Sequence, residues 1–412
     1  LGDVYKRQHF TFTEDWRMGQ VENAAKLDKF IQEVKELTGS RKVNLYGLSH
    51  GGQLTATYLY YYGAKGDVDR AIMDAPATCG TQLVVDLFEG NIHFDVATLI
   101  EYVEIGFRKE YEYEWLVEAF GFDRLNQAFN DIIHQYLLDV VINFGSVWDF
   151  VPPDKYEEFK AKYLDPVENA GLIAKSDEMH YNAMAHMSDG LKRAQDAGTK
   201  IAIIANTEHD IGTSTGVNSD YIIDVHSASG AYCAPFGEKF PADYKKQNTV
   251  CNDPTHWHIS PERDIDASCA YLPENTWFVN GQFHGMCPWD RYTRNFYLTF
   301  FFTDRITDVY SDHEFPQFNL GQNPANGLYV KFDKSPSGFH TSKDTALTIE
   351  SLSEQYDTEI ISVKADGMDV DLSVKNGTVL KVGESCKIEF KKHSLPKSTE
   401  PFTVTVVYSL KN

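Results

Sequence analysis

Apolar and polar positions in the N-terminal part of the chain follow two different periods. Residues 9–13 alternate like a strand, 43–46 and 71–75 are short apolar runs, and 23–37 and 51–62 carry apolar side chains at helical spacing. Strands and helices that follow one another in this rhythm are typical of parallel βαβ units. The sequence therefore predicts an α/β fold with a mostly parallel sheet.

The pattern changes between residues 79 and 200, which hold long helical runs and no clear strand. These runs are 96–107, 113–120 and 125–144. Residues 201–205 and 277–279 then resume the buried-strand pattern. We expect 79–200 to be a helical insertion that covers one end of the sheet as a lid, inside a first domain at 9–309.

Short runs with period-two alternation follow from residue 310 to the end of the chain. These runs are 328–332, 346–349, 360–364, 370–374, 386–390 and 402–408. Turn residues such as Asp366-Gly367 and Asn376-Gly377 separate them. A series of this kind over about 100 residues is typical of an immunoglobulin-like β-sandwich, which we expect at 310–412.

The charge balance restricts the partners. Acidic residues outnumber basic ones by 60 to 38, and the formal net charge is −22. Nucleic acids and anionic membrane surfaces would repel such a chain, and no run of Lys or Arg supplies a local basic patch. A neutral substrate fits this charge best. No stretch of about 18 apolar residues predicts a membrane span.

The six cysteines form no C-x-x-C pair, which argues against a zinc ribbon or a thioredoxin-like site. Cys251 and Cys269 flank a loop-like segment. The sequence leaves open whether these two form a disulfide or are isolated buried thiols.

Other candidate metal and cofactor ligands follow no known pattern. His180 and His186 share one predicted helix, but a helical metal pair needs a spacing of about three or four residues, so we expect surface or lid residues. Asp264 and Asp266 lack the oxygen-rich loop of a calcium site. Because phosphate-loop and dinucleotide fingerprints are also missing from the sequence, we expect no metal and no cofactor.

The sequence Gly47-Leu48-Ser49-His50-Gly51 matches the G-x-S-x-G motif, directly after an apolar strand and before a helix. In this context a serine nucleophile occupies a strained turn, and its neighbours must be small. The helix N-terminus directs N–H groups at the developing negative charge, and the backbone N–H of His50 is one expected oxyanion donor. The alternative is a glycine-rich strand–helix turn without chemistry.

Four segments resemble bacterial lipases, in particular the branch related to lecithin–cholesterol acyltransferase. They are Asp15-Trp16-Arg17, Glu22-Asn23-Ala24 with Leu27, Val43-Asn44-Leu45 and the Ser49 motif. The resemblance runs from about residue 15 to about 290, and 146–153 is similar to a lid segment of that branch. It implies the α/β-hydrolase fold and a Ser–Asp–His triad. The C-terminal module lies outside it.

The triad acid is expected after strand 201–205, because the chain order in this fold is Ser, then Asp or Glu, then His. The segment 219–228 is similar to the lipase pattern S-D-G-x-V-P-x-S-S-A, which makes Asp220 the acid. The sequence departs from that pattern at Tyr221, where Gly is usual, and at Asp224, where Pro is usual. Asp210 and Asp224 are the alternative acids.

The expected base is His284, which lies in a glycine-flanked loop after a late strand. A serine hydroxyl needs such a base, and the base needs an orienting carboxylate. His226, next to the acid candidate, and His256 and His258, in another loop, are the alternatives.

These residues predict a serine carboxylester hydrolase, a lipase or esterase, that cleaves neutral lipid or other acyl esters through an acyl-enzyme. An acyltransferase or phospholipase of the same fold is the first alternative, and a catalytically silent surface-binding protein is the second. We expect a secreted or cell-surface bacterial protein that contacts a lipid interface or cell surface through the lid or the C-terminal domain.

Residues 1–8 (LGDVYKRQ) resemble the translation of a sequencing-library transposon end, as found in open reading frames from metagenomes. We expect them to be an artefact that replaces the natural N-terminus. A signal peptide is then not readable. Under that expectation, edge strands of the sheet and the second oxyanion N–H, which normally follows an earlier strand, are missing.

Overall fold

The chain forms two compact units, Leu1–Gln317 and Phe318–Asn412, each considered by itself. The computed structural model describes residues 8–411 except for 98, 101–113, 213–215, 254–255, 257, 286–290, 313–314, 320–327, 333–344, 352–356, 366–367, 370–376, 382–383 and 391–403. Residues 1–7 of the expected artefact therefore lie outside the described residues.

The first unit ends after Gln317 rather than after residue 309, where the sequence placed the boundary. The segment before Gln317 is tied to the start of the last parallel strand. Trp277 Nε1 donates to the Phe315 carbonyl at 3.0 Å, and Gln317 Nε2 donates to the Thr276 carbonyl at 3.1 Å. Phe315 is also part of a hydrophobic core of this unit.

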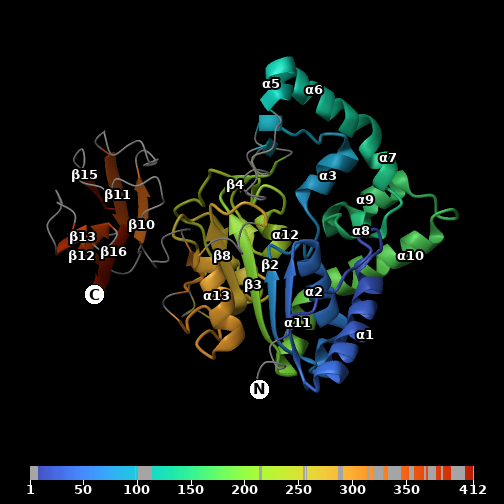
Figure 1. Cartoon of the computed structure of the whole chain (residues 1–412), viewed down its shortest axis with the longest axis horizontal. Coiled ribbons are helices and arrows are strands. Elements are labelled where there is room, and N and C mark those ends of the chain that lie inside the picture. The colour runs from blue at the N-terminus through green and yellow to red at the C-terminus, as the bar shows by residue number, and fades with distance from the viewer. Residues whose placement is uncertain are drawn as a thin grey trace. The chain divides into compact units, whose positions relative to one another are not determined.

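Four parallel strands form the sheet of the first unit, in the order β1-β2-β3-β8 (Figure 1). Their bounds are β1 Val43–Leu48, β2 Val68–Asp74, β3 Lys200–Thr207 and β8 Thr276–Asn280. A mixed α/β fold with a parallel sheet is thus confirmed.

Helices cover both faces of this sheet. Met73 and Ile203 lie in a core with α1 (Gln20–Thr38), α2 (His50–Tyr62) and α11 (Met187–Asp196). Their sequence neighbours Ile72 and Ile204 lie in a second core with α13 (Arg291–Phe302). Successive side chains of a strand point to opposite faces, so a strand between two helical layers needs apolar residues at every position. Figure 1 shows α13 on one side of the sheet and α1, α2 and α11 on the other.

The strand predicted at 9–13 is wrong, since these residues form neither strand nor helix. Phe12 packs against Phe30 of α1, with ring centroids 5.4 Å apart. The alternation therefore reflects the partial burial of the Phe12 side chain against α1. A strand also needs a hydrogen-bonding neighbour, which a single-chain pattern does not reveal.

The segment 79–200 is helical up to the start of β3 and has no other strand among its described residues. Its elements are α3 Gln82–Glu89, α5 Glu114–Phe120, α6 Phe122–Ile132, η3 Ile133–Leu137, α7 Leu138–Val141, α8 Gly145–Asp149, α9 Pro153–Tyr163, α10 Ala170–Glu178, η4 Met179–Met184 and α11. Phe88, Trp148 and Phe159 centre a core of its own. Most of the helix expected at 96–107 lies outside the described residues.

The last part of this segment joins the main core instead. Met184 of η4 and Met187 and Leu191 of α11 are buried in the same cluster as Leu54 and Leu59 of α2. Here the expected insertion covers the face of the sheet rather than its end.

Long loops connect β3 to β8. They contain β4 His209–Asp210, β5 Asn218–Ser219, α12 Val225–Ser229, β6 Tyr232–Cys233, β7 Ile265–Asp266, η5 Ala267–Cys269 and η6 Pro273–Asn275. One further turn, η2 Gly63–Lys65, follows α2. No helix in the described part of the chain is both long and apolar enough to cross a bilayer.

The second unit holds two antiparallel sheets, β10-β11-β15 and a sheet in which β13, β14 and β16 pair with β12. The strands of these two sheets are β10 Leu328–Phe332, β11 Thr345–Ser351, β12 Asp357–Ala365, β13 Met368–Asp369, β14 Thr378–Leu380, β15 Ser385–Phe390 and β16 Val404–Lys411. The short strand β9 Phe318–Asn319 instead follows β8 in the strand order of the sheet that contains β1, β2 and β3. Five of the six expected runs are strands. The run 370–374 lies outside the described residues, and an immunoglobulin-like arrangement stays a prediction.

Candidate active site

Ser49 occupies a strained turn at the carboxyl end of β1. Its backbone φ of 57° and ψ of −119° lie in a region that residues other than glycine rarely adopt. The Ser49 N–H donates to the Asp74 carbonyl at 2.9 Å, and the Ser49 carbonyl accepts from the Gln53 N–H at 3.0 Å. These bonds hold the turn between β2 and the first turn of α2.

Close packing explains Gly47, the glycine two positions before Ser49. A Cβ added to Gly47 would lie 2.1 Å from the Gly51 carbonyl oxygen, which is far inside van der Waals contact. A Cβ at Gly52 would lie 2.7 Å from Pro76 Cβ, whereas one at Gly51 would have no neighbour within 4 Å. Positions 47 and 52 therefore require glycine, whereas position 51 has room for a larger side chain.

Asp220 and His284 form a buried pair. His284 Nδ1 lies 2.8 Å from Asp220 Oδ2, and the two residues are 8% and 1% exposed. The other carboxylate oxygen, Oδ1, accepts from the backbone N–H groups of Ile222 at 3.1 Å and Ile223 at 2.7 Å. The backbone N–H of His284 also donates to the backbone carbonyl of Asp220 at 2.8 Å. Both the carboxylate and the imidazole are thus held in one orientation.

The carboxylate changes the proton affinity of the imidazole. Burial lowers the pKa of His284. The negative charge of Asp220, the hydrogen bond to Asp220 and the negative charge of Asp74 all raise it, and together they outweigh burial, so the pKa lies above its usual value. A raised pKa makes the ring a stronger base.

Tyr221 adopts φ 86°, a conformation that favours glycine, where the lipase pattern has glycine. Its ring covers Gly212, because a Cβ added there would lie 2.7 Å from Tyr221 Cζ. Tyr221 also meets the Phe283 ring edge-on, and Phe283 stacks on His209 at 3.9 Å. The departure from the lipase pattern therefore adds packing around the His284 loop.

The alternative residues have other partners. Asp224 caps α12, because its Oδ1 accepts the Ser227 N–H at 2.8 Å. Asp210 Oδ1 accepts the Val217 N–H at 3.1 Å in the β4–β5 hairpin. His226 Nδ1 lies 2.9 Å from the Ala231 carbonyl. His256 and His258 lie with Glu274, in a separate cluster.

The loops that carry Ser49 and His284 meet at the carboxyl edge of the sheet. A Cβ added to Gly285 would lie 4.0 Å from Leu48 Cδ2. Asp74, which accepts the Ser49 N–H through its backbone, also raises the pKa of His284. Ligands of α/β proteins bind at this edge of the sheet.

Asp74 is a buried residue of this edge that the sequence did not single out. It is 0% exposed at the end of β2, and its Oδ2 accepts from the hydroxyl groups of Tyr46 at 2.6 Å and Tyr297 at 2.5 Å. The signal available in the sequence was an acidic residue that ends an apolar strand.

His50, the expected oxyanion donor, is the first residue of α2. The first N–H groups of a helix have no acceptor within the helix, so they are available to a ligand. The His50 side chain pairs with Glu14, Nδ1 to Oε1 at 2.8 Å, and its ring centroid lies 5.2 Å from that of Phe150. Glu14 and Phe150 therefore fix the side chain of the residue that follows Ser49.

His180, expected at the surface or in the lid, is buried in η4 at 3% exposed. Its ring stacks on Tyr156 with centroids 3.7 Å apart, and Nε2 lies 2.9 Å from the Trp148 carbonyl. Burial lowers the pKa of His180 to about 4. His180 is therefore not a surface residue, although it lies within the segment 79–200 expected to be the lid, whereas His186 is exposed.

An exposed apolar face runs along α5, α6, η3 and α7, which form the arm beyond α3 in Figure 1. Its large side chains, each at least 36% exposed, are Phe120, Phe122, Phe129, Ile132, Tyr136 and Val140. From Phe122 onward they recur at spacings close to whole helical turns. An exposed apolar face of this kind is typical of surfaces that meet a lipid interface or a partner.

Comparisons with protein-family models, with curated protein sequences and with solved structures found no match to this chain. The resemblance of the Ser49 region to lipases therefore stays a prediction.

Proposed function

We propose that this protein is a serine carboxylester hydrolase in which Ser49 is the nucleophile, His284 the base and Asp220 the acid. The observation that carries the proposal is the buried Asp220–His284 pair, with its 2.8 Å contact, at the same sheet edge as the strained Ser49 turn. A serine, a histidine and a carboxylate in these roles are the requirements for acyl transfer.

In this mechanism the Ser49 hydroxyl attacks the ester carbonyl carbon and its proton passes to His284 Nε2. Asp220 holds the Nδ1–H and stabilises the imidazolium that forms. The backbone N–H of His50 donates to the carbonyl oxygen as it becomes negative. The imidazolium then protonates the leaving alcohol, and a water activated by His284 hydrolyses the acyl-enzyme.

We infer a neutral, apolar acyl ester as the substrate. The net charge of −22 disfavours anionic substrates, and the apolar face of α5 to α7 fits a lipid interface. The proposal includes the finer fold assignment, an α/β-hydrolase domain with a helical lid followed by an immunoglobulin-like module, and a secreted or cell-surface location.

The test is hydrolysis of p-nitrophenyl esters with acyl chains from short to long. We expect Ser49→Ala to abolish turnover, because it removes the nucleophile. Ser40→Ala, a change in the turn after α1, is the matched control and should retain full activity. Turnover that persists in Ser49→Ala would refute the assignment of Ser49, and the chain-length optimum separates a lipase from an esterase.

A further inference from the structure

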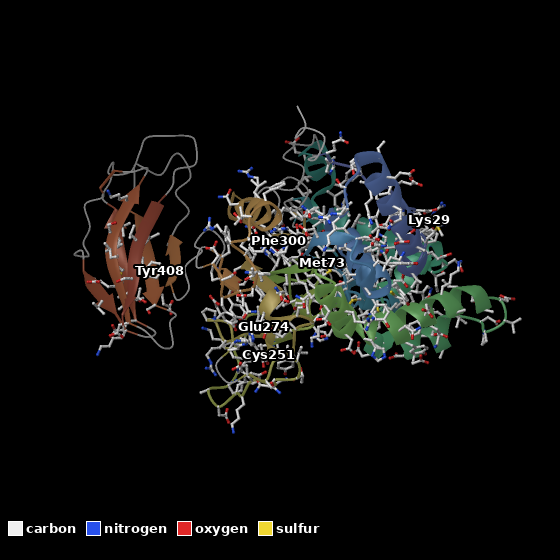
Figure 2. The ribbon with its side chains drawn as sticks, turned by 90° about the horizontal axis from the view of Figure 1, so that it is seen from below. Lys29, Met73, Cys251, Glu274, Phe300 and Tyr408 are labelled. Carbon is white, nitrogen blue, oxygen red and sulfur yellow. The ribbon has the colours of Figure 1, made fainter. Side chains whose placement is uncertain are left out.

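Four side chains that bind metals in other proteins meet away from Asp220 and His284. Cys251, His256 and His258 come from the loop between β6 and β7, and Glu274 comes from η6 just before β8. One ligand atom from each lies within 4.8 Å of all the others. Figure 2 shows Cys251 and Glu274 next to each other.

The distances between these atoms match a tetrahedral metal site. Zinc lies about 2.0–2.3 Å from nitrogen, oxygen and sulfur ligands, so tetrahedral ligands are about 3.3–3.6 Å apart. His256 Nδ1 lies 3.5 Å from Cys251 Sγ and 3.2 Å from Glu274 Oε1. His258 Nε2 lies 3.9 Å from the same Glu274 oxygen. The remaining pairs of ligand atoms are no more than 4.8 Å apart, so a bound ion would need to draw them together by about 1 Å.

A neighbouring amide sets the proton position on His258, which is fully buried. Gln317 Nε2 donates to the carbonyls of Pro273 at 2.7 Å and Thr276 at 3.1 Å, which fixes the amide so that its oxygen faces His258. Gln317 Oε1 lies 2.8 Å from His258 Nδ1. In the neutral ring the proton therefore sits on Nδ1, and Nε2 presents its lone pair to the cluster, with the Tyr310 hydroxyl also 3.5 Å away. Metal-ligating histidines are typically oriented in this way.

We propose that Cys251, His256, His258 and Glu274 bind a structural Zn²⁺ ion. Three nitrogen and sulfur ligands favour zinc over calcium or magnesium, which take oxygen ligands. A thiolate and a carboxylate together neutralise the charge of the ion, which suits a partly buried site. Four protein ligands leave no open position, as in structural rather than catalytic zinc sites.

The ion stabilises a segment with little structure of its own. The stretch 234–264 contains no helix or strand among its described residues, and long stretches of this kind are uncommon in compact domains. Zinc would join it to η6 at the start of β8. The prediction of no metal rested on the absence of paired cysteines, of a helical histidine pair and of a calcium loop, whereas this set combines C-x4-H-x-H with a glutamate from a later element.

The test is the zinc content and the cobalt spectrum of the full chain. We expect about one zinc per purified chain. After exchange for Co²⁺, we expect a thiolate-to-cobalt charge-transfer band that is lost in Cys251→Ser. Cys386→Ser, a change in the second unit, is the matched control and should keep both the metal and the band. A wild-type chain that takes up neither ion, or a band that survives in Cys251→Ser, would overturn the proposal.

Two further measurements apply if Cys251→Ser does not fold. Glu274→Gln keeps the shape of the side chain and removes its charge, and it should weaken zinc binding at least tenfold. A chelator should lower the unfolding temperature of the wild type and of Cys386→Ser. An unchanged affinity in Glu274→Gln, or an unfolding temperature that the chelator does not alter, counts against the site.

Discussion

Replacement of Asp220 by asparagine tests the proposed triad with little change in shape. The two backbone N–H groups of Ile222 and Ile223 bind Oδ1 in the wild type, and they require an oxygen at that position. The asparagine amide is therefore fixed with its oxygen toward these donors and its NH₂ toward His284 Nδ1. An NH₂ group can only donate. The imidazole must then accept at Nδ1 and carry its proton on Nε2.

This tautomer cannot take the proton from Ser49. The same exchange in a Ser–His–Asp protease leaves the geometry intact and lowers kcat by about 10⁴. A factor of about 10⁴ corresponds to about 5.4 kcal/mol of transition-state stabilisation. Because the hydrogen bonds to Ile222 and Ile223 remain, we expect the fold to be preserved.

The assay compares kcat/KM for a p-nitrophenyl ester in the wild type, in Asp220→Asn and in Asp210→Asn. Asp210 was one of the two alternative acids, and its variant should lose little activity because Asp210 Oδ1 accepts the Val217 N–H in a hairpin, whereas Asp220 contacts the His284 ring. Loss of the neighbouring charge should also lower the pKa of His284, measured by NMR titration of the ring. Activity of Asp220→Asn within about tenfold of the wild type would refute the reasoning.

Three other predictions follow from packing and ionisation. Gly47→Ala should fail to fold or should lose several kcal/mol of unfolding free energy, because its Cβ would overlap the Gly51 carbonyl. Gly51→Ala has open space around the new Cβ, so its unfolding temperature should lie within a few degrees of that of the wild type. Burial raises the pKa of Asp149 to about 7, so the wild type should lose up to about 4 kcal/mol of stability as the pH rises from about 4 to 7. Asp149→Asn keeps an oxygen for the Gln20 N–H, so its free energy of unfolding in urea should equal that of the wild type at pH 4 and exceed it at pH 8. Equal unfolding free energies of the two proteins at both pH values would count against a buried carboxyl with a raised pKa. Ester hydrolysis should fall with decreasing pH, with a midpoint above the usual imidazole value of about 6.5, since His284 must be neutral; a midpoint below that value would exclude this ring as the base.

The parallel strands were predictable because burial on both faces leaves continuous apolar runs. The runs at 43–46, 201–205 and 277–279 lie within strands of the sheet, and the run 71–75 extends one residue past the end of β2. The false strand at 9–13 has the right alternation, but alternation reports which side chains are buried and not whether a neighbouring strand exists.

The site was predictable where its chemistry leaves a local motif. The Ser49 turn has such a motif, because the geometry of the turn excludes a side chain at Gly47. Asp220 and His284 are 64 residues apart, and the sequence offered several other carboxylates and imidazoles nearby. Only the fold shows which carboxylate and which ring meet. The Cys251 cluster was missed for the same reason, since Glu274 reaches it from a different element.

The most direct test of the central claim is labelling with a fluorophosphonate, which forms a covalent bond only with an activated serine. The proposed function predicts that mass spectrometry finds the label on the peptide that contains Ser49. Ser49→Ala should carry no label, and His284→Ala should react far more slowly because the base is removed. A wild-type chain that leaves Ser49 unlabelled, or a label on another serine that persists in Ser49→Ala, would contradict the account.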